Sequence, residues 1–138
     1  MTRSRVIDRD RGYKALKRRL LDLGDKEVAV GIPEDATYPN GTPVALVGAV
    51  HEFGNAEHKA KAPLRKAFDR GKAEVRLEVR KVARAIVDGR MTEEQALLGL
   101  GEKQVELVRQ EVIRAGLVDS GRLRDSYQAE VRKKGDRR

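Results

Sequence analysis

The sequence predicts an α+β fold in which a small, mostly antiparallel sheet packs against several helices, one of them long. Apolar residues recur every three or four positions along much of the 138-residue chain, which is the period of an amphipathic helix. Only two short stretches, 26–32 and 127–131, alternate apolar and polar residues as strands do. The two stretches lie at opposite ends of the sequence, and we expect them to pair with each other.

The first half of the chain contains two expected helices with clear stop signals. Residues 8–23 carry one apolar stripe, and Gly24 follows where a helix C-terminus favours glycine. The segment 43–53 begins with proline, which suits a first helical turn, and Gly54 ends it. Between the first expected strand and this helix, residues 34–42 are rich in turn formers and predict an exposed loop or hairpin tip.

The second half contains the longest periodic segment. Its apolar stripe predicts one long helix from Pro63 to Asp88. Residues 92–95 match a capping box and predict the start of a further helix that extends to Ala115. Ser120-Gly121 then predicts a turn before the last strand.

Net charge is concentrated at the two ends of the sequence. Residues 1–20 contain eight Lys/Arg and two Asp, residues 132–138 contain five and one, and residues 21–131 contain 17 basic and 19 acidic residues. We therefore expect a single domain over 1–138 with basic, flexible ends at 1–7 and 132–138 that contact DNA or an acidic partner. The residues concerned are Arg3, Arg5, Arg132, Lys133, Lys134, Arg137 and Arg138.

Composition limits the class of protein further. The chain has no cysteine, which excludes disulfides and thiolate metal sites. It has no apolar run of the roughly 18 residues that a membrane span needs and no signal-peptide pattern at its start. We expect synthesis in the cytoplasm and no membrane partner.

Candidate catalytic and metal-ligating residues do not have the spacing that their chemistry needs. A zinc-protease helix places two histidines four residues apart, whereas His51 and His58 are seven apart. Ser120 and Ser126 lack the glycine-flanked turn of a serine nucleophile, and no phosphate-binding glycine loop is present. We expect no catalytic residue, no metal and no cofactor.

Three short segments stand out by their order along the chain. His51-Glu52-Phe53-Gly54 ends the expected short helix. Lys61-Ala62-Pro63-Leu64-Arg65 then leads into the expected long helix. Leu117-Val118-Asp119-Ser120-Gly121-Arg122-Leu123-Arg124-Asp125-Ser126 precedes the last strand. The order and separation resemble the virion-morphogenesis or tail-component family of tailed bacteriophages, which usually has Arg-Pro-Phe in the second segment and Thr at the position of Ser120.

The resemblance implies a structural subunit of the phage neck or head-proximal tail, which completes the tail or joins it to the head, and not an enzyme. Such proteins assemble as homo-oligomeric rings, often six-fold, with other neck, connector and tail proteins. Packaged DNA in the lumen would meet the basic ends without sequence specificity. The implied location is the virion. The candidate subunit contacts are His51, Glu52, Phe53, Pro63, Arg65, Asp119, Arg122 and Arg124.

Several alternatives remain open on the sequence. A tail terminator fits the same segments. A small basic nucleic-acid-binding protein fits a net charge of +8 and an isoelectric point near 10.0. Arg122 and Arg124 either pair with neighbouring aspartates or anchor an interface. We also expect the loop 55–61 to become ordered only against a neighbouring subunit.

Overall fold

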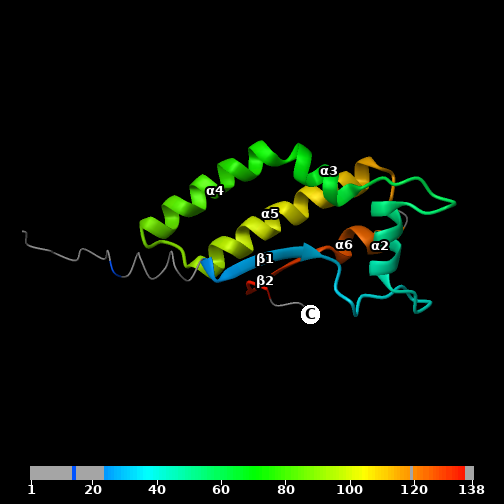
Figure 1. Cartoon of the computed structure of the whole chain (residues 1–138), viewed down its shortest axis with the longest axis horizontal. Helices are drawn as coiled ribbons and strands as arrows, with labels where there is room; N and C mark the ends of the chain where they lie inside the picture. The colour runs from blue at the N-terminus through cyan, green and yellow to red at the C-terminus, as the bar shows by residue number, and fades with distance from the viewer. Residues whose placement is uncertain (1–13, 15–23, 119, 136–138) are drawn as a thin grey trace, which may run out of the picture.

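The computed structural model describes residues 14, 24–118 and 120–135 (Figure 1). The elements are β1 (Lys26–Gly31), α2 (Val44–Phe53), α3 (Pro63–Arg70), α4 (Lys72–Val87), α5 (Glu93–Arg114), α6 (Arg122–Ser126) and β2 (Gln128–Lys133). The predicted α+β class is confirmed. The helix expected over 8–23 lies outside the described residues, apart from Lys14.

The two strands form an antiparallel pair, as predicted. Val28 lies opposite Val131, and Glu27 lies opposite Arg132. β2 ends two residues later than the sequence predicted, because Arg132 and Lys133 continue the ladder. Arg132 Nε also donates to Glu27 Oε1 at 2.9 Å. The expectation of a flexible end at 132–138 is therefore wrong for its first two residues, which belong to the sheet.

Helix α5 is the central element. The capping box is confirmed, since Gln95 N donates to Thr92 Oγ1 at 3.2 Å and Thr92 N donates to Gln95 Oε1 at 3.0 Å. α5 packs between the sheet on one side and α3 and α4 on the other (Figure 1). Its buried residues form half of the main core, and the other half comes from α2, α3, α6 and the residue before β2. This core consists of Val44, Ala67, Val105, Leu107, Val108, Val112, Leu123 and Tyr127.

The expected single helix over 63–88 is in fact two helices, α3 and α4, which meet at Gly71. The ribbon changes direction there (Figure 1). Gly71 is buried, and a Cβ atom at this position would lie 2.5 Å from Leu107 Cδ1 and 2.8 Å from Ala67 O. The close approach of α5 thus requires glycine at the bend. Of the predicted apolar stripe, Phe68 is 52% exposed and outside the core.

A buried carboxylate joins α3 to α5. The side chain of Glu111 is 7% exposed and lies between two arginines. Arg70 Nη1 lies 3.2 Å from one carboxylate oxygen, and Arg114 Nη1 lies 2.8 Å from the other. Both arginine side chains remain more than half exposed, so water still solvates their charge while they neutralise the buried acid.

Candidate functional site

Two of the three segments that carry the family resemblance, 51–54 and 117–126, meet at one end of the molecule, and we call them the first and second motif segments. α2 and α6 lie against each other there, although about 70 residues separate them in sequence (Figure 1). A pocket of about 190 Å³ between them is lined by His51 from the first segment and by Ser120, Gly121 and Leu123 from the second. A second, mostly apolar pocket of about 210 Å³ lies beside Glu52 and Phe53.

Glu52 caps the N-terminus of α3. The residue before this helix, Ala62, has a left-handed backbone (φ 48°) and provides no side-chain cap. Leu64 N donates to Glu52 Oε2 at 2.9 Å, and Arg65 N donates to Glu52 Oε1 at 3.2 Å. Pro63, at the first helical position, has no N–H to satisfy. The carboxylate of α2 therefore supplies the acceptors that the helix start needs, and we assign Glu52 an internal role.

His51 holds the other end of the connecting loop. Its carbonyl accepts hydrogen bonds from Lys61 N at 2.8 Å and Ala62 N at 3.0 Å. Burial lowers the pKa of its imidazole, and the nearby charges of His58 and Lys61 lower it further. The imidazole is thus neutral near pH 7 and lines the pocket without an ionic partner among the described residues.

The loop 55–61 has internal bonds that fix its shape. Asn55 Oδ1 accepts from Glu57 N at 3.0 Å and from His58 N at 2.7 Å. A Cβ atom at Gly54, where φ is 76°, would lie 2.8 Å from Ala60 N, so only glycine fits the end of the first motif. Lys61 Nζ donates to the carbonyl of Ala115 at 3.1 Å. These bonds give the loop a defined shape within one chain, and its ordering against a neighbouring subunit stays a prediction.

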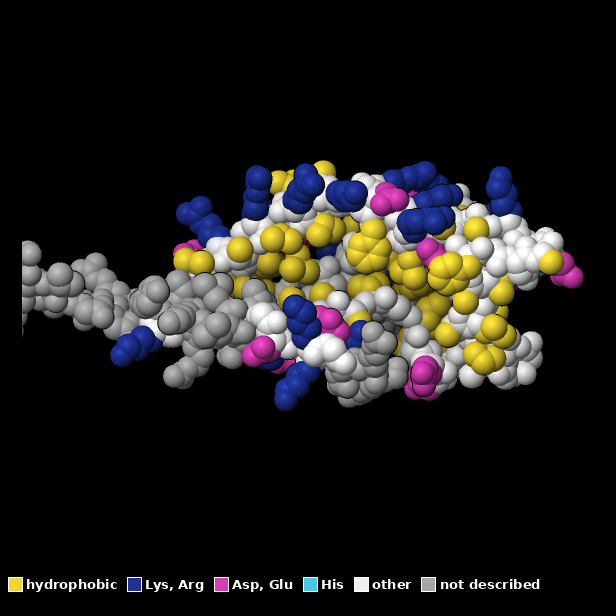
Figure 2. All heavy atoms as spheres, in the orientation of Figure 1, with side chains coloured by type: hydrophobic (Ala, Val, Ile, Leu, Met, Phe, Trp, Pro, Cys, Tyr) yellow, Lys and Arg dark blue, Asp and Glu magenta, His cyan; other side chains and the backbone are white. Residues whose placement is uncertain are grey.

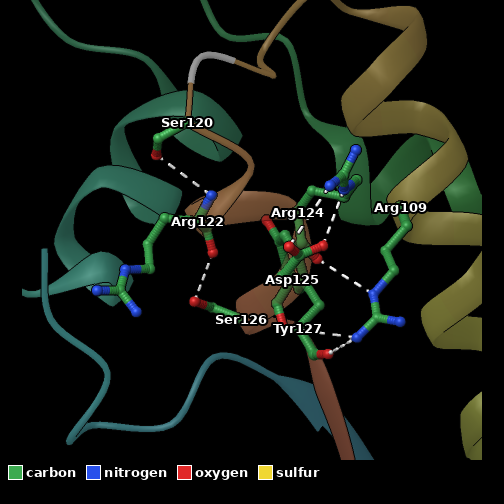
Figure 3. Close-up of polar contacts among 7 residues, drawn as sticks. All are labelled: Arg109, Ser120, Arg122, Arg124, Asp125, Ser126 and Tyr127. Carbon is green, nitrogen blue, oxygen red and sulfur yellow. Dashed lines mark hydrogen bonds and ion pairs between the residues drawn. The ribbon is translucent and has the colours of Figure 1, made fainter.

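The second segment forms a short helix, α6, where the sequence predicted only a turn. Gly121 precedes it with φ 79°. Ser126 Oγ donates to Arg122 O at 2.6 Å, and Ser120 Oγ accepts from Arg122 N at 3.3 Å (Figure 3). Leu123 is buried in the core. The Ser120 hydroxyl thus stabilises the predicted turn, and the Ser126 hydroxyl stabilises the helix.

Arg109 of α5 caps the other end of α6. Its Nε donates to the carbonyl of Arg124 at 3.2 Å, and its Nη2 donates to the carbonyls of Asp125 at 3.5 Å and Tyr127 at 3.1 Å (Figure 3). These carbonyls would otherwise lack partners at the helix end. No sequence pattern indicated this role, since Arg109 is one of several charged residues between the buried positions of α5.

Arg124 and Arg122 have different surroundings. Arg124 pairs with its neighbour Asp125 at 2.8 Å, and this contact lowers the pKa of the Asp125 carboxyl. The local ion pair left open by the sequence is thus present. The guanidinium of Arg122 is exposed and makes no bond to another described residue. Asp119 lies outside the described residues.

The aromatic side chains at this end differ in exposure. Phe53 is 81% exposed, whereas Tyr127 is 1% exposed. The hydroxyl of Tyr127 is buried without a hydrogen-bond partner among the described residues. Burial, with smaller contributions from Glu52 and Tyr38, raises the pKa of Tyr127 to about 12. Tyr127 is therefore a core residue, and Phe53 remains available for contact with another chain.

The structure also shows a basic face on α3 and α4 (Figure 2). The near-zero charge of residues 21–131 as a whole gave no indication of it. Residues 65–90 contain nine Lys/Arg and four Asp/Glu, whereas the rest of 21–131 contains eight basic and fifteen acidic residues. Lys and Arg side chains line the edge of the molecule formed by α3 and α4 (Figure 2). The near-neutral middle of the sequence thus contains a basic segment over α3 and α4 and an acidic remainder.

The basic ends are described only in part. Arg132 and Lys133 belong to β2, and Lys134 N donates to the carbonyl of Asp25 at 2.8 Å. The remaining candidates for contact with DNA, Arg3, Arg5, Arg137 and Arg138, lie outside the described residues. Of the candidate subunit contacts, Pro63 is buried and Arg65 is exposed at the first turn of α3.

Comparisons with family models, curated proteins and solved structures find no match to this chain. Within the described ranges, no group of three or more His, Asp or Glu side chains is placed to hold a metal ion. None of the helices in the described part of the chain is long and apolar enough to cross a membrane.

Proposed function

We propose that the chain is a non-catalytic structural subunit of a tailed-phage neck or head-proximal tail, where it completes the tail or joins it to the head within a homo-oligomeric ring. The observation that carries this proposal is the meeting of the two motif segments at one end of the fold. Glu52 and Arg109 stabilise that end by capping α3 and α6. A rigid end that also exposes apolar and charged side chains is well suited to repeated contact between subunits.

Exposed side chains at the same end support a contact role. Phe53 and Leu46 of α2 are 81% and 58% exposed, and the guanidinium of Arg122 makes no bond to another described residue. Aromatic residues and arginine are enriched where protein interfaces gain most of their energy. The sheet has two strands, β1 and β2, in the described part of the chain, so each strand has one edge that another chain could pair with.

The experiment that tests the proposal is to locate the chain in assembled particles. Mass spectrometry of purified virions that encode it should detect the chain in several copies per particle, and antibody labelling should place it at the head–tail junction. Particles made without it should accumulate as separate heads and tails. Complete, infectious particles that lack the chain would contradict the proposal. Location at the end of isolated tails would favour the tail terminator.

The basic face on α3 and α4 supports a second candidate, a free nucleic-acid-binding protein. A positive stripe along a helix is the usual electrostatic footprint of phosphate binding. Titration of the chain with duplex DNA over a range of salt concentrations separates this candidate from the first. Tight binding whose salt dependence survives removal of residues 1–7 and 134–138 would favour it.

A further inference from the structure

Helix α4 presents a row of positive charges that no anion in the described chain neutralises. The cationic stripe of α4 consists of Lys72, Arg76, Arg80 and Arg84. These residues are exposed and follow one another at intervals of four, so each is about 6 Å further along one face of the helix. Their side chains make no ion pair or hydrogen bond to another described residue. Glu74, on the same helix, is engaged by Lys103 of α5 at 3.1 Å.

The same face also carries exposed apolar side chains. Leu77 and Val87 of α4 are 58% and 60% exposed, and their positions in the helix place them beside the cationic stripe. Phosphate groups of a nucleic acid would neutralise the cations but would leave these side chains in water. A protein surface that offers both acids and apolar side chains would cover both, which favours a protein as the occupant.

Helix α5 offers a surface of that kind. The acidic stripe of α5 consists of Glu102 and Glu106, with Leu98 and Ile113 on either side along the helix. The two glutamates are exposed and four residues apart, which gives the same rise of about 6 Å as in α4. Leu98 and Ile113 are 38% and 54% exposed. Glu102 has no partner among the described residues, and Lys103 approaches Glu106 only to 3.8 Å.

The two stripes do not face each other within one molecule. The buried residues of α4, Val82, Ala85 and Ile86, are on the side opposite the cationic stripe, and α4 packs on α5 in the fold. This packing turns the stripe away from the glutamates of its own chain. Each copy therefore presents a basic, partly apolar helix face and an acidic, partly apolar helix face that are complementary in charge and in spacing.

We propose that the cationic stripe of α4 in one copy binds the acidic stripe of α5 in the next copy. The contact joins two different surfaces, so repetition produces a closed ring or an open filament. The inference rests on the proposed ring assembly and adds a second pair of contact surfaces to those at the motif segments. These surfaces lie on the outer sides of α4 and α5.

Charge reversal on each side tests the interface. One variant carries Arg76→Glu and Arg80→Glu, a second carries Glu102→Arg and Glu106→Arg, and a third carries all four changes. A matched control reverses two exposed lysines outside α4, Lys59→Glu and Lys66→Glu. Sedimentation velocity of the full chain measures self-association, and circular dichroism verifies the helix content and melting of each variant.

Each two-site reversal should weaken self-association by about tenfold or more, because close charge pairs at interfaces have effects of this size. An equimolar mixture of the two variants should recover association, since each then meets a neighbour of opposite charge. The four-site variant should recover it alone, and the lysine control should behave as the wild type. A wild-type chain that stays monomeric at every concentration tested, or reversed variants that associate normally, would overturn the interface.

Duplex DNA provides the competing outcome. If the Arg76→Glu and Arg80→Glu variant loses duplex binding in fluorescence anisotropy but associates normally, the stripe binds nucleic acid and the inference is overturned. Failure of the interface leaves the proposed function standing whenever particles still contain the chain at the head–tail junction. Absence of the chain from particles contradicts the proposed function itself, so the two failures are distinguishable.

Discussion

Replacing Glu52 with alanine tests whether the first motif acts inside the fold. The structure assigns its carboxylate two hydrogen bonds, to Leu64 N at 2.9 Å and Arg65 N at 3.2 Å. No other side chain caps α3 at this end. The substitution therefore removes both acceptors and the negative charge that favours a helix N-terminus, and it leaves the packing of Ala67 against α5 in place.

The expected loss follows from these two contributions. Removal of an N-terminal cap costs about 0.5 to 2 kcal/mol, and loss of a carboxylate from the first turn costs about 0.3 to 1 kcal/mol. Because Glu52 is half-buried, we expect the free energy of unfolding to fall by about 1 to 2 kcal/mol. For a chain of this size the melting temperature should fall by about 3 to 7 °C. Glu52→Gln retains an acceptor and should lose about half as much.

Urea unfolding followed by circular dichroism measures the change, and Glu57→Ala is the matched control. Glu57 lies in the adjacent loop, is exposed, and uses only its backbone N–H in a bond, to Asn55. The control should unfold within about 0.5 kcal/mol of the wild type. If Glu52→Ala also unfolds within that range, or if Glu57→Ala costs as much, the assigned cap role is refuted.

Three further predictions concern the core. Gly101→Ala should destabilise the chain by about 1 to 3 kcal/mol, because a Cβ atom there would lie 2.7 Å from Ala129 Cβ. Gly99→Ala, two residues earlier in the open part of α5, should stabilise it by about 0.5 to 1 kcal/mol; urea unfolding that ranks the two equally would contradict the close approach of β2. Glu111→Ala should lower the free energy of unfolding by about 1 to 2 kcal/mol, because the two arginines that it pairs with stay solvated. Urea unfolding at low salt and at 1 M salt should give an equal loss, because the carboxylate itself is buried. Tyr127→Phe should leave stability at pH 7 unchanged or slightly higher, because the lost hydroxyl has no partner among the described residues. The folded-state pKa of Tyr127, about 12, exceeds the usual value near 10, so the wild type should lose stability as the pH rises from about 10 to 12; a phenylalanine variant with the same alkaline loss would contradict this.

Local signals in the sequence predicted the helices and strands well. The capping box at Thr92 and Gln95 is a contact between neighbours in sequence, and it was confirmed. The two alternating segments pair as expected, because they are the only described strands and each leaves half its side chains for one face. The helix at 43–53 ends at Gly54, whose backbone only glycine adopts without strain.

The errors arose where a distant element decides the local structure. The apolar stripe predicted one long helix over 63–88, but the structure has two helices that meet at Gly71, where Leu107 of α5 leaves no room for a Cβ atom. Arg132 looked like part of a free basic end, but its place opposite Glu27 extends the strand. Neither partner lies near in sequence, so no periodicity could reveal the contact.

In the candidate site, too, the sequence identified the local segments but not the roles that depend on distant contacts. The sequence singled out both motif segments, and they lie together in the fold. It assigned Glu52 to a subunit contact, whereas the structure uses its carboxylate to cap α3. It could not identify Arg109 as the residue that caps α6. Each of these roles depends on where a helix end lies relative to another helix.

The sequence by itself determined the α+β class, the capped start of α5 and the pairing of the two strands, because period, caps and turns are set by residues close along the chain. Only the tertiary structure decided the bend at Gly71, the caps supplied by Glu52 and Arg109, and the separation of charge between α4 and α5. These features depend on side chains that are far apart in sequence and meet only after the helices pack. The sum of charges is fixed by composition, but their arrangement on the surface is fixed by the fold.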